Sequence, residues 1–204
     1  MNLQAARPRL ILASGSATRA ALLTSAGLAF TPMKPAIDET AIKRDAQGQG
    51  ASPDEAALLL ADLKAQRAAR TNPDDLVIGC DQLLVCEDRW FDKPASLAEA
   101  RTQLQALRGR THTLVTAILC RGGGQHIWHH IARPRLVMRD FSDAFLDAYL
   151  ALEGDAVLSC VGAYRLEGPG AHLFDSVEGE HAAVLGLPLL PLLGFLRQHG
   201  VVMG

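Results

Sequence analysis

Leu76-Val77-Ile78-Gly79-Cys80-Asp81-Gln82 is the stretch that decides the fold of this chain of 204 residues. Its β-branched and small apolar residues predict a buried strand that stops at Asp81. A hairpin-length insertion then leads to a second polar group, Asp92-Lys93-Pro94. Open α/β sheets bind their ligands at the carboxyl ends of strands, where polar side chains converge. Asp81 is therefore the first candidate for chemistry.

Strand-like and helix-like patterns alternate along the rest of the chain. Further strands are predicted at residues 9–13, 29–33, 111–120, 125–131, 157–161 and 172–174, and a hairpin joins 83–86 to 90–91. Helices are predicted at 20–26, 52–70, 96–107, 142–153 and 189–199, the second and third opened by capping boxes. Residues 38–40 are expected to form an acidic turn and 46–51 a linker. No linker is long enough to separate domains, so we expect a single α/β domain over residues 1–204.

The overall composition is that of an ordinary globular protein, with 49% apolar and 21% charged residues. A formal net charge of −2 gives no electrostatic case for binding nucleic acid or a membrane surface. The longest apolar tract, 184–196, is interrupted by two prolines and is too short to span a membrane. The four cysteines form no C-x-x-C pair, which favours buried free thiols in a reducing cytoplasm over a zinc site.

The polar residues that follow the apolar strands form a set suited to phosphate. Residues 14–19, with Ser14, Ser16 and Arg19, can form an anion-binding turn before a helix, although a serine cap beside a solvated arginine explains the same pattern. Lys64 is expected to extend from the edge of its helix toward a cleft, and Lys93 adds a second ammonium group.

Acidic residues complete this set. Glu39 lies in an acidic turn, which can be a solvated turn or can hold magnesium together with substrate phosphates. Asp81 and Asp92 follow the central strand and its hairpin. Carboxylates that lie close together need a metal ion or protons, and lysines beside them suit a phosphate-rich substrate. The residues alone therefore indicate a metal-dependent phosphoryl or nucleotidyl hydrolase.

Three histidines lie on the predicted strand 125–131, namely His126, His129 and His130. Strand alternation places His126 and His130 on one face, with no third metal ligand in view. An exposed strand face explains them better than a metal site.

Seven motifs in order resemble those of the Maf family of nucleoside triphosphate pyrophosphatases. They are L-A-S-G-S-A-T-R-A-A-L-L at 12–23, D-E-T at 38–40, L-A-D-L-K-A at 60–65, I-G-C-D-Q at 78–82 with K-P at 93–94, G-R-T-H at 109–112, E-G at 167–168 and G-L-P-L at 186–189. Each motif is weak alone, but the series covers nearly the whole chain.

The resemblance implies cleavage of a nucleoside triphosphate into a monophosphate and pyrophosphate. It implies that Asp81 acts as general base or metal-linked acid and that Glu39 helps to hold a divalent cation, Mg²⁺ or Mn²⁺, with Asp81. It assigns the triphosphate to Ser14, Ser16, Arg19, Lys64 and Lys93. It also implies an elongated mixed central sheet flanked by helices with an open cleft, like that of the inosine triphosphatases. Family members are often dimers, which makes a homodimer a possible assembly.

Three positions of the resemblance concern the choice of base: Thr18, Gln82 and Glu167. Gln82 and Glu167 match the branch associated with 7-methyl-GTP, whereas Thr18 matches neither that branch nor the one that favours dTTP and UTP. A carboxylate at Glu167 can accept hydrogen bonds from the N1–H and exocyclic amine of guanine. The alternatives are a dTTP/UTP or ITP pyrophosphatase and, from another class, a non-catalytic regulator of septum formation.

Overall fold

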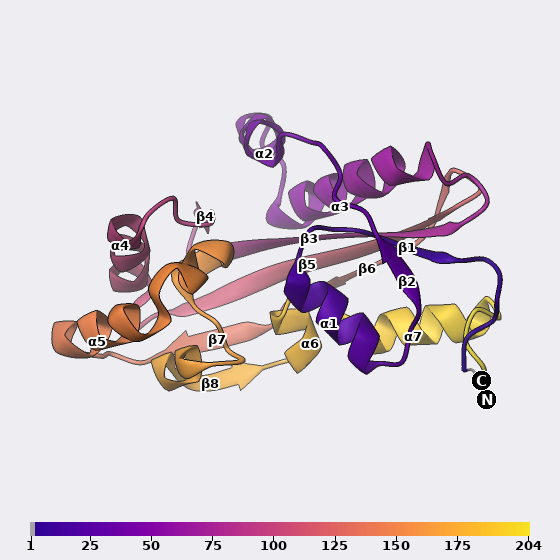
Figure 1. The fold of residues 1–204 in the computed structure, drawn as a ribbon. Helices are drawn as coiled ribbons and strands as arrows, with labels where there is room; N and C mark the ends of the chain where they lie inside the picture. Colours follow the sequence, from indigo (N-terminus) through magenta and orange to yellow (C-terminus); the bar gives the residue numbers. More distant parts are fainter. Residues whose placement is uncertain (1–2) are drawn as a thin grey trace. The chain divides into compact units, whose positions relative to one another are not determined.

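The computed structural model describes residues 3–204, and Figure 1 shows their arrangement as a mixed α/β fold. Within these residues eight strands join one sheet in the order β2-β1-β3-β5-β7-β8, with β4 paired to β3 and β6 to β5. The strands are β1 (Leu10–Ala13), β2 (Phe30–Pro32), β3 (Leu76–Cys86), β4 (Arg89–Phe91), β5 (Thr111–Gly122), β6 (Gln125–Ala132), β7 (Arg135–Met138) and β8 (Phe174–Glu178). The predicted mixed sheet is confirmed.

The α-helices are α1 (Ala17–Ser25), α2 (Glu39–Gly48), α3 (Pro53–Ala69), α4 (Leu97–Leu107), α5 (Asp143–Glu153), α6 (His181–Val184) and α7 (Leu189–Gln198). Three short 3₁₀ helices, η1 (Gly154–Ser159), η2 (Val161–Ala163) and η3 (Pro169–Leu173), join α5 to β8. Among the described residues, no helix combines the length and apolar character needed to cross a membrane.

The chain forms two compact units, each built from separate stretches of sequence. Unit 1 comprises residues 3–81, Thr116–Ala132 and His181–Gly204, and unit 2 comprises Gln82–Val115 and Arg133–Glu180. The long strands β3 and β5 each lie partly in unit 1 and partly in unit 2. The single domain expected over residues 1–204 stays a prediction.

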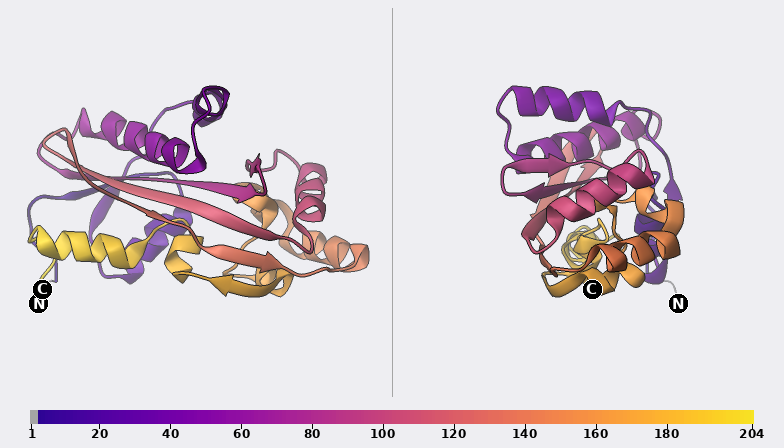
Figure 2. Two further views of the ribbon diagram at one scale, coloured as in Figure 1. Left: turned by 180° about the vertical axis from the view of Figure 1, so that it is seen from behind. Right: turned by 90° about the vertical axis from the view of Figure 1, so that its left-hand side faces the viewer.

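Unit 1 is organised by three parallel strands in the order β2-β1-β3. Leu12 of β1 is in register with Pro32 of β2 and with Ile78 of β3. Helix α3 lies on one face of these strands, and α1 and α7 lie on the other, as Figures 1 and 2 show. Because side chains alternate along a strand, Ile78 and Cys80 point into the core formed with α1 and α7. The intervening Gly79 and Asp81 are thereby placed on the face covered by α3.

Gly79 allows α3 to pack directly on β3. A Cβ atom at this position would overlap the backbone carbonyl oxygen of Ala61 and lie 2.9 Å from the Cβ of Ala65. Ala61 and Ala65 are fully buried, so the helix and strand backbones are in close contact. This close approach sets the distance from α3 to the next residue on the same face of β3, Asp81.

Unit 2 contains β4, β7 and β8 with helices α4 and α5, together with the halves of β3 and β5 that lie in this unit. Within it β7 pairs antiparallel with both β5 and β8. His112 on β5 is 2% exposed, and its Nε2 lies 2.8 Å from the hydroxyl of Tyr164. Burial lowers the pKa of His112 to about 4 and raises the pKa of Tyr164 well above its usual value, so both groups are neutral.

Most predicted elements are confirmed, but the central strand is longer than expected. β3 continues through Asp81 to Cys86, so Asp81 lies inside the strand and not at its end. Its continuation pairs with β4, which confirms the hairpin. The sequence prediction ended the strand at Asp81 because a carboxylate is unusual within a buried strand. Here the carboxylate is tolerated because it has a buried partner, as described below.

Four local predictions were wrong. Asp38 is not in a turn but caps α2, because its Oδ1 accepts a hydrogen bond from the amide of Ala41. Helix α2 then includes the first half of the predicted linker, residues 46–48. Helix α1 begins three residues early, with Ser16 as its N-cap. Residues 157–161 form 3₁₀ turns, since a short buried apolar run does not by itself distinguish a strand. Strand β7 and the short helix α6 were not predicted.

The histidines on β6 pair differently from the prediction. The pairing of β5 with β6 shifts between Cys120 and Arg121, so that Trp128 faces Cys120 and His126 faces Arg121. This bulge resets the alternation, and His126 Nε2 lies 3.0 Å from His129 Nδ1. No group of three or more histidine, cysteine or acidic side chains within residues 3–204 is placed to hold a metal ion.

Candidate functional site

The turn between β1 and α1 carries the predicted anion-binding residues. Ser14 is buried, and its Oγ accepts hydrogen bonds from the Ser16 amide and from Nη1 of Arg19, each at 3.2 Å. Ser16 caps α1, since its Oγ accepts from the Arg19 amide. Because Ser14 Oγ accepts twice, its hydroxyl proton is left to donate to an anion. Thr18 lies on the first turn of α1 and is half-buried.

Arg19 is fixed by three neutral acceptors. Its Nε donates to the carbonyl oxygen of Gly186 at 2.7 Å, and its Nη1 donates to the carbonyl oxygen of Cys80 at 3.1 Å and to Ser14. Gly186 has a φ of +94°, and a Cβ atom there would lie 3.1 Å from Arg19 Nε. Among residues 3–204 no carboxylate pairs with this guanidinium, so its orientation is fixed while its charge is not offset.

Lys64, Asp81 and Glu39 form a compact charged group beside this turn. Lys64 Nζ lies 2.6 Å from Asp81 Oδ1 and 2.9 Å from Glu39 Oε2. The side chains of Lys64 and Asp81 are only 5% and 6% exposed, whereas that of Glu39 is 51% exposed. Lys64 is therefore buried between α3 and β3 and does not extend from the helix edge as expected. One lysine faces two carboxylates, which leaves the group with a net charge of −1.

The register of the parallel strands explains why these residues meet. Because Leu12 pairs with Ile78, Ser14, which directly follows β1, lies level with Cys80 inside β3. Asp81 is the next residue, and Gly79 brings α3 close enough for Lys64 to reach it. Burial raises the pKa of the Cys80 thiol to about 11, so Cys80 contributes a neutral side chain and a carbonyl for Arg19.

The oxygen donors of Glu39 and Asp81 fit a hard divalent cation. Magnesium is commonly bound by one or two protein carboxylates with the remaining ligands from water and substrate phosphates. The carboxylates of Asp81 and Glu39 each contact Lys64 through one oxygen, and each has a second oxygen that Lys64 does not contact. The donor set is consistent with a cation that needs substrate to complete its coordination.

The remaining predicted residues, Gln82, Lys93 and Glu167, belong to unit 2. Glu167 Oε1 lies 3.9 Å from Nε of Arg165, whose Nη1 contacts Glu153 Oε2 at 3.2 Å. Burial raises the pKa of the Cys160 thiol; the charge of Glu167 raises it further, while Lys93 and Arg165 oppose this. Lys93 and Glu167 thus lie in the electrostatic environment of one thiol. Gln82 is half-buried and faces away from Asp81 by strand alternation.

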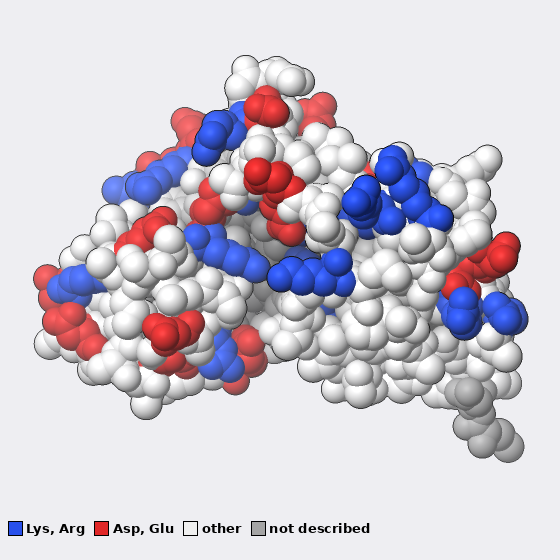
Figure 3. Space-filling model, turned by 45° about the horizontal axis from the view of Figure 1, so that its top comes forward, with Lys and Arg blue, Asp and Glu red and all other residues white. Residues whose placement is uncertain are grey.

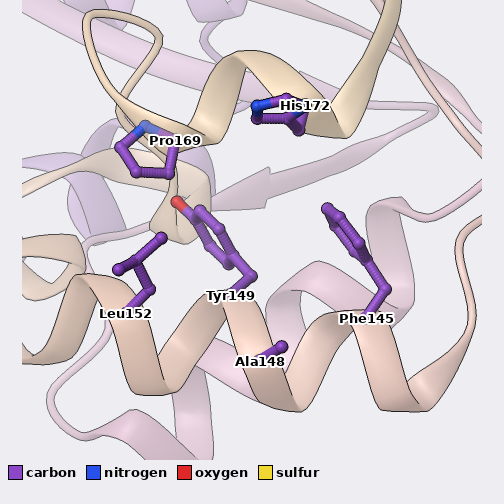
Figure 4. A pocket seen from close by; sticks show the side chains of 6 residues that line it. All are labelled: Phe145, Ala148, Tyr149, Leu152, Pro169 and His172. Atoms are coloured by element: carbon purple, nitrogen blue, oxygen red, sulfur yellow. The ribbon is translucent and has the colours of Figure 1, made fainter.

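A separate pocket in unit 2 contains none of the predicted residues. Figure 4 shows it between α5 and η3, with a volume of about 130 Å³ and lined by Phe145, Ala148, Tyr149, Leu152, Pro169 and His172. The Tyr149 hydroxyl donates to the carbonyl oxygen of Ala163. A mainly apolar lining without a lysine or arginine does not suit phosphate groups.

Sequence reasoning missed residues that position the site from a distance. The carbonyl of Gly186 and the ion pair of Arg165 with Glu153 were not predicted, although the G-L-P-L motif includes Gly186. A glycine within an otherwise apolar strand, Gly79, was the available signal for close backbone contact.

Comparison with known proteins assigns the class. The family model described as Maf-like protein matches residues 9–199, and this chain belongs to that family. A nucleoside triphosphate pyrophosphatase of Granulibacter bethesdensis is 53% identical over 191 residues, covering 94% of this chain and 97% of the relative. One of Gluconobacter oxydans is 54% identical, covering 93% and 94%. A 7-methyl-GTP pyrophosphatase of Rhizobium meliloti is 44% identical over 196 residues, covering 96% and 98%.

Proposed function

We propose that this protein hydrolyses a nucleoside triphosphate to the nucleoside monophosphate and pyrophosphate. The observation that carries the proposal is the buried Lys64–Asp81 pair beside the Ser14–Arg19 turn, where Arg19 donates to the carbonyl oxygen of Cys80. The turn offers the Ser14 hydroxyl and an arginine whose charge is not offset, and the pair offers a fixed carboxylate. Relatives that match over nearly their whole length carry names for this activity.

In the proposed mechanism, Asp81 handles the proton. Lys64 holds Oδ1, so Oδ2 is the atom that accepts a proton from the attacking water. The water oxygen forms the new bond to phosphorus while the anhydride bond between the α and β phosphates breaks, and the electron pair of that bond leaves with the departing phosphate oxygen. Ser14, Ser16 and Arg19 bind the phosphates and offset their charge.

Glu39, with Asp81 beside it, would hold the divalent cation, Mg²⁺ or Mn²⁺, whose charge would offset that of the substrate phosphates when bound. The net charge of −1 on the Lys64 group favours a cation at this position.

For the base, we propose a modified purine such as 7-methyl-GTP. The support comes from Gln82 and Glu167, together with relatives named 7-methyl-GTP pyrophosphatase. Arg165 contacts both Glu167 and Glu153, and the buried Glu153 side chain fixes its guanidinium. The other carboxylate oxygen of Glu167 is then left to accept hydrogen bonds from the edge of a base. Lys93 is proposed as an additional contact to the triphosphate.

We place this activity in the cytoplasm. All four cysteines are free, which suits a reducing compartment. No nucleic-acid partner is proposed, because the face in Figure 3 carries acidic side chains among the basic ones and the net charge is −2.

A nucleotide panel tests the proposal. Pyrophosphate release from 7-methyl-GTP, dTTP, UTP and ITP is measured under one condition, with and without added magnesium. We expect turnover that requires magnesium, with 7-methyl-GTP preferred. Asp81→Asn should lose most turnover while nucleotide binding persists, and Gln82→Thr should shift preference toward pyrimidines without abolishing hydrolysis. Turnover that is undiminished in Asp81→Asn would overturn the role of Asp81, and silence across the panel would favour a regulator.

A further inference from the structure

Lys34 lies at the same edge of the sheet as the anion-binding turn. β2 and β1 are parallel, and Leu12 is in register with Pro32, so Lys34 follows β2 at the position where Ser14 follows β1. The amide of Met33 donates to the carbonyl oxygen of Leu12 at 2.8 Å, which extends the pairing by one residue toward Lys34. Backbone pairing thus fixes the start of the Lys34 side chain beside the turn.

The aliphatic part of Lys34 lies across Gly15. A Cβ atom built on Gly15 would be 3.2 Å from Cγ and Cδ of Lys34 and 3.6 Å from its Cε. The contact includes the carbon next to the ammonium group, so Nζ is only one bond further along. The absence of a side chain at Gly15 is what allows the stem to rest on the turn, between Ser14 and Ser16.

The ammonium group of Lys34 differs from the other cations of unit 1 at this edge. Lys64 is matched by two carboxylates, and Arg19 is held by carbonyl and hydroxyl oxygens. Lys34 is exposed, and no acidic side chain within residues 3–204 pairs with it. A side chain that is positioned by its stem while its charge has no partner is suited to bind an anion.

We propose that Lys34 binds the phosphate chain of the substrate, as a further cation beside Ser14, Ser16 and Arg19. This inference rests on the proposed function, because it assigns the ligand of Lys34 to the same site. Since Lys34 contributes charge and no proton transfer, it acts on substrate binding and leaves the chemical step to Asp81.

Steady-state kinetics of Lys34→Met tests the inference, with Lys34→Arg and Arg70→Met as controls. Lys34→Met should raise KM for the triphosphate roughly five- to thirtyfold with kcat within about twofold. Lys34→Arg keeps the charge and should stay within about threefold of wild type. Arg70 follows α3 and precedes β3, so it lies toward the amino ends of the parallel strands, away from Lys34. Arg70→Met therefore removes an equal charge from unit 1 and should leave KM unchanged.

The salt dependence of KM provides a second measurement. Raising the ionic strength weakens exposed charge pairs, so KM of the wild type should rise more steeply with salt than KM of Lys34→Met. If the role of Lys34 were merely structural, KM of Lys34→Met would depend on ionic strength as steeply as KM of the wild type. KM of Lys34→Arg would still agree with that of the wild type. A KM of Lys34→Met within about twofold of wild type overturns the inference.

Calorimetric binding of inorganic tripolyphosphate, in the presence of magnesium, separates this inference from the proposed function. If the wild type hydrolyses no nucleotide, the proposed function fails, and the role of Lys34 is read from binding alone. We then expect the Kd of tripolyphosphate to be roughly five- to thirtyfold weaker in Lys34→Met. Equal affinities in the two proteins would overturn the role of Lys34 in binding phosphate.

Discussion

Removing Lys64 while keeping Asp81 should destabilise unit 1 more than removing both charges. Lys64→Met leaves the Asp81 carboxylate, which is 6% exposed, without the ammonium that lies 2.6 Å away. A buried ion pair that loses one partner typically costs about 3–5 kcal/mol. Asp81→Asn should cost only about 1 kcal/mol, because Lys64 keeps Glu39 and can still donate to the amide oxygen. The double variant buries no unpaired charge, so we expect its cost to be about 1–2 kcal/mol.

The predicted coupling between the two substitutions is therefore about 2–5 kcal/mol, from the sum of the single costs minus the double. Urea unfolding at pH 7 measures it, followed by tryptophan fluorescence in a Trp90→Phe background. Trp128 then remains as the reporter, and it stacks on Phe195 within unit 1 at 4.8 Å between ring centres. Costs that add to within about 0.5 kcal/mol would refute the reasoning, because they would show that the two charges do not depend on each other.

Three further predictions concern stability. His112 should make the protein sensitive to acid. Its pKa is about 4 in the folded protein, and the ordinary value of 6.5 applies to the unfolded chain, so unfolding takes up a proton between these pH values. The free energy of unfolding should therefore fall as the pH is lowered through this window. Thermal unfolding of His112→Gln should show a flatter slope there, and parallel curves would contradict the assignment. Gly79→Ala should cost about 1–3 kcal/mol or more and lower turnover, because its methyl group pushes Ala61 away and separates Lys64 from Asp81; an unaltered melting temperature would exclude this contact. Ser52→Ala should cost about 1 kcal/mol in urea unfolding by removing one half of the capping box of α3, whereas Ser52→Gly should cost less.

The sequence by itself determined the local elements and the chemical type of the site. Ser52 with Glu55 specifies the start of α3, and Gly154 specifies the end of α5, because caps depend on residues within one turn. The order of motifs identified the family, and the types of Asp81, Lys64 and Arg19 indicated phosphate chemistry. Local signals failed where two structures satisfy the same pattern, as for Asp38, whose side chain suits a turn and a helix cap equally.

The tertiary structure alone decided how those residues are paired. Asp81 lies within β3 because Lys64, seventeen positions earlier in sequence, reaches it from α3, and that approach depends on the missing side chain of Gly79. Arg19 is oriented by the carbonyl of Gly186, which is 167 residues away. Such partners come from strand register and helix packing, which local propensity does not encode. The sequence therefore determined which groups are present, and the packing of β3 against α3 decided which charge faces which.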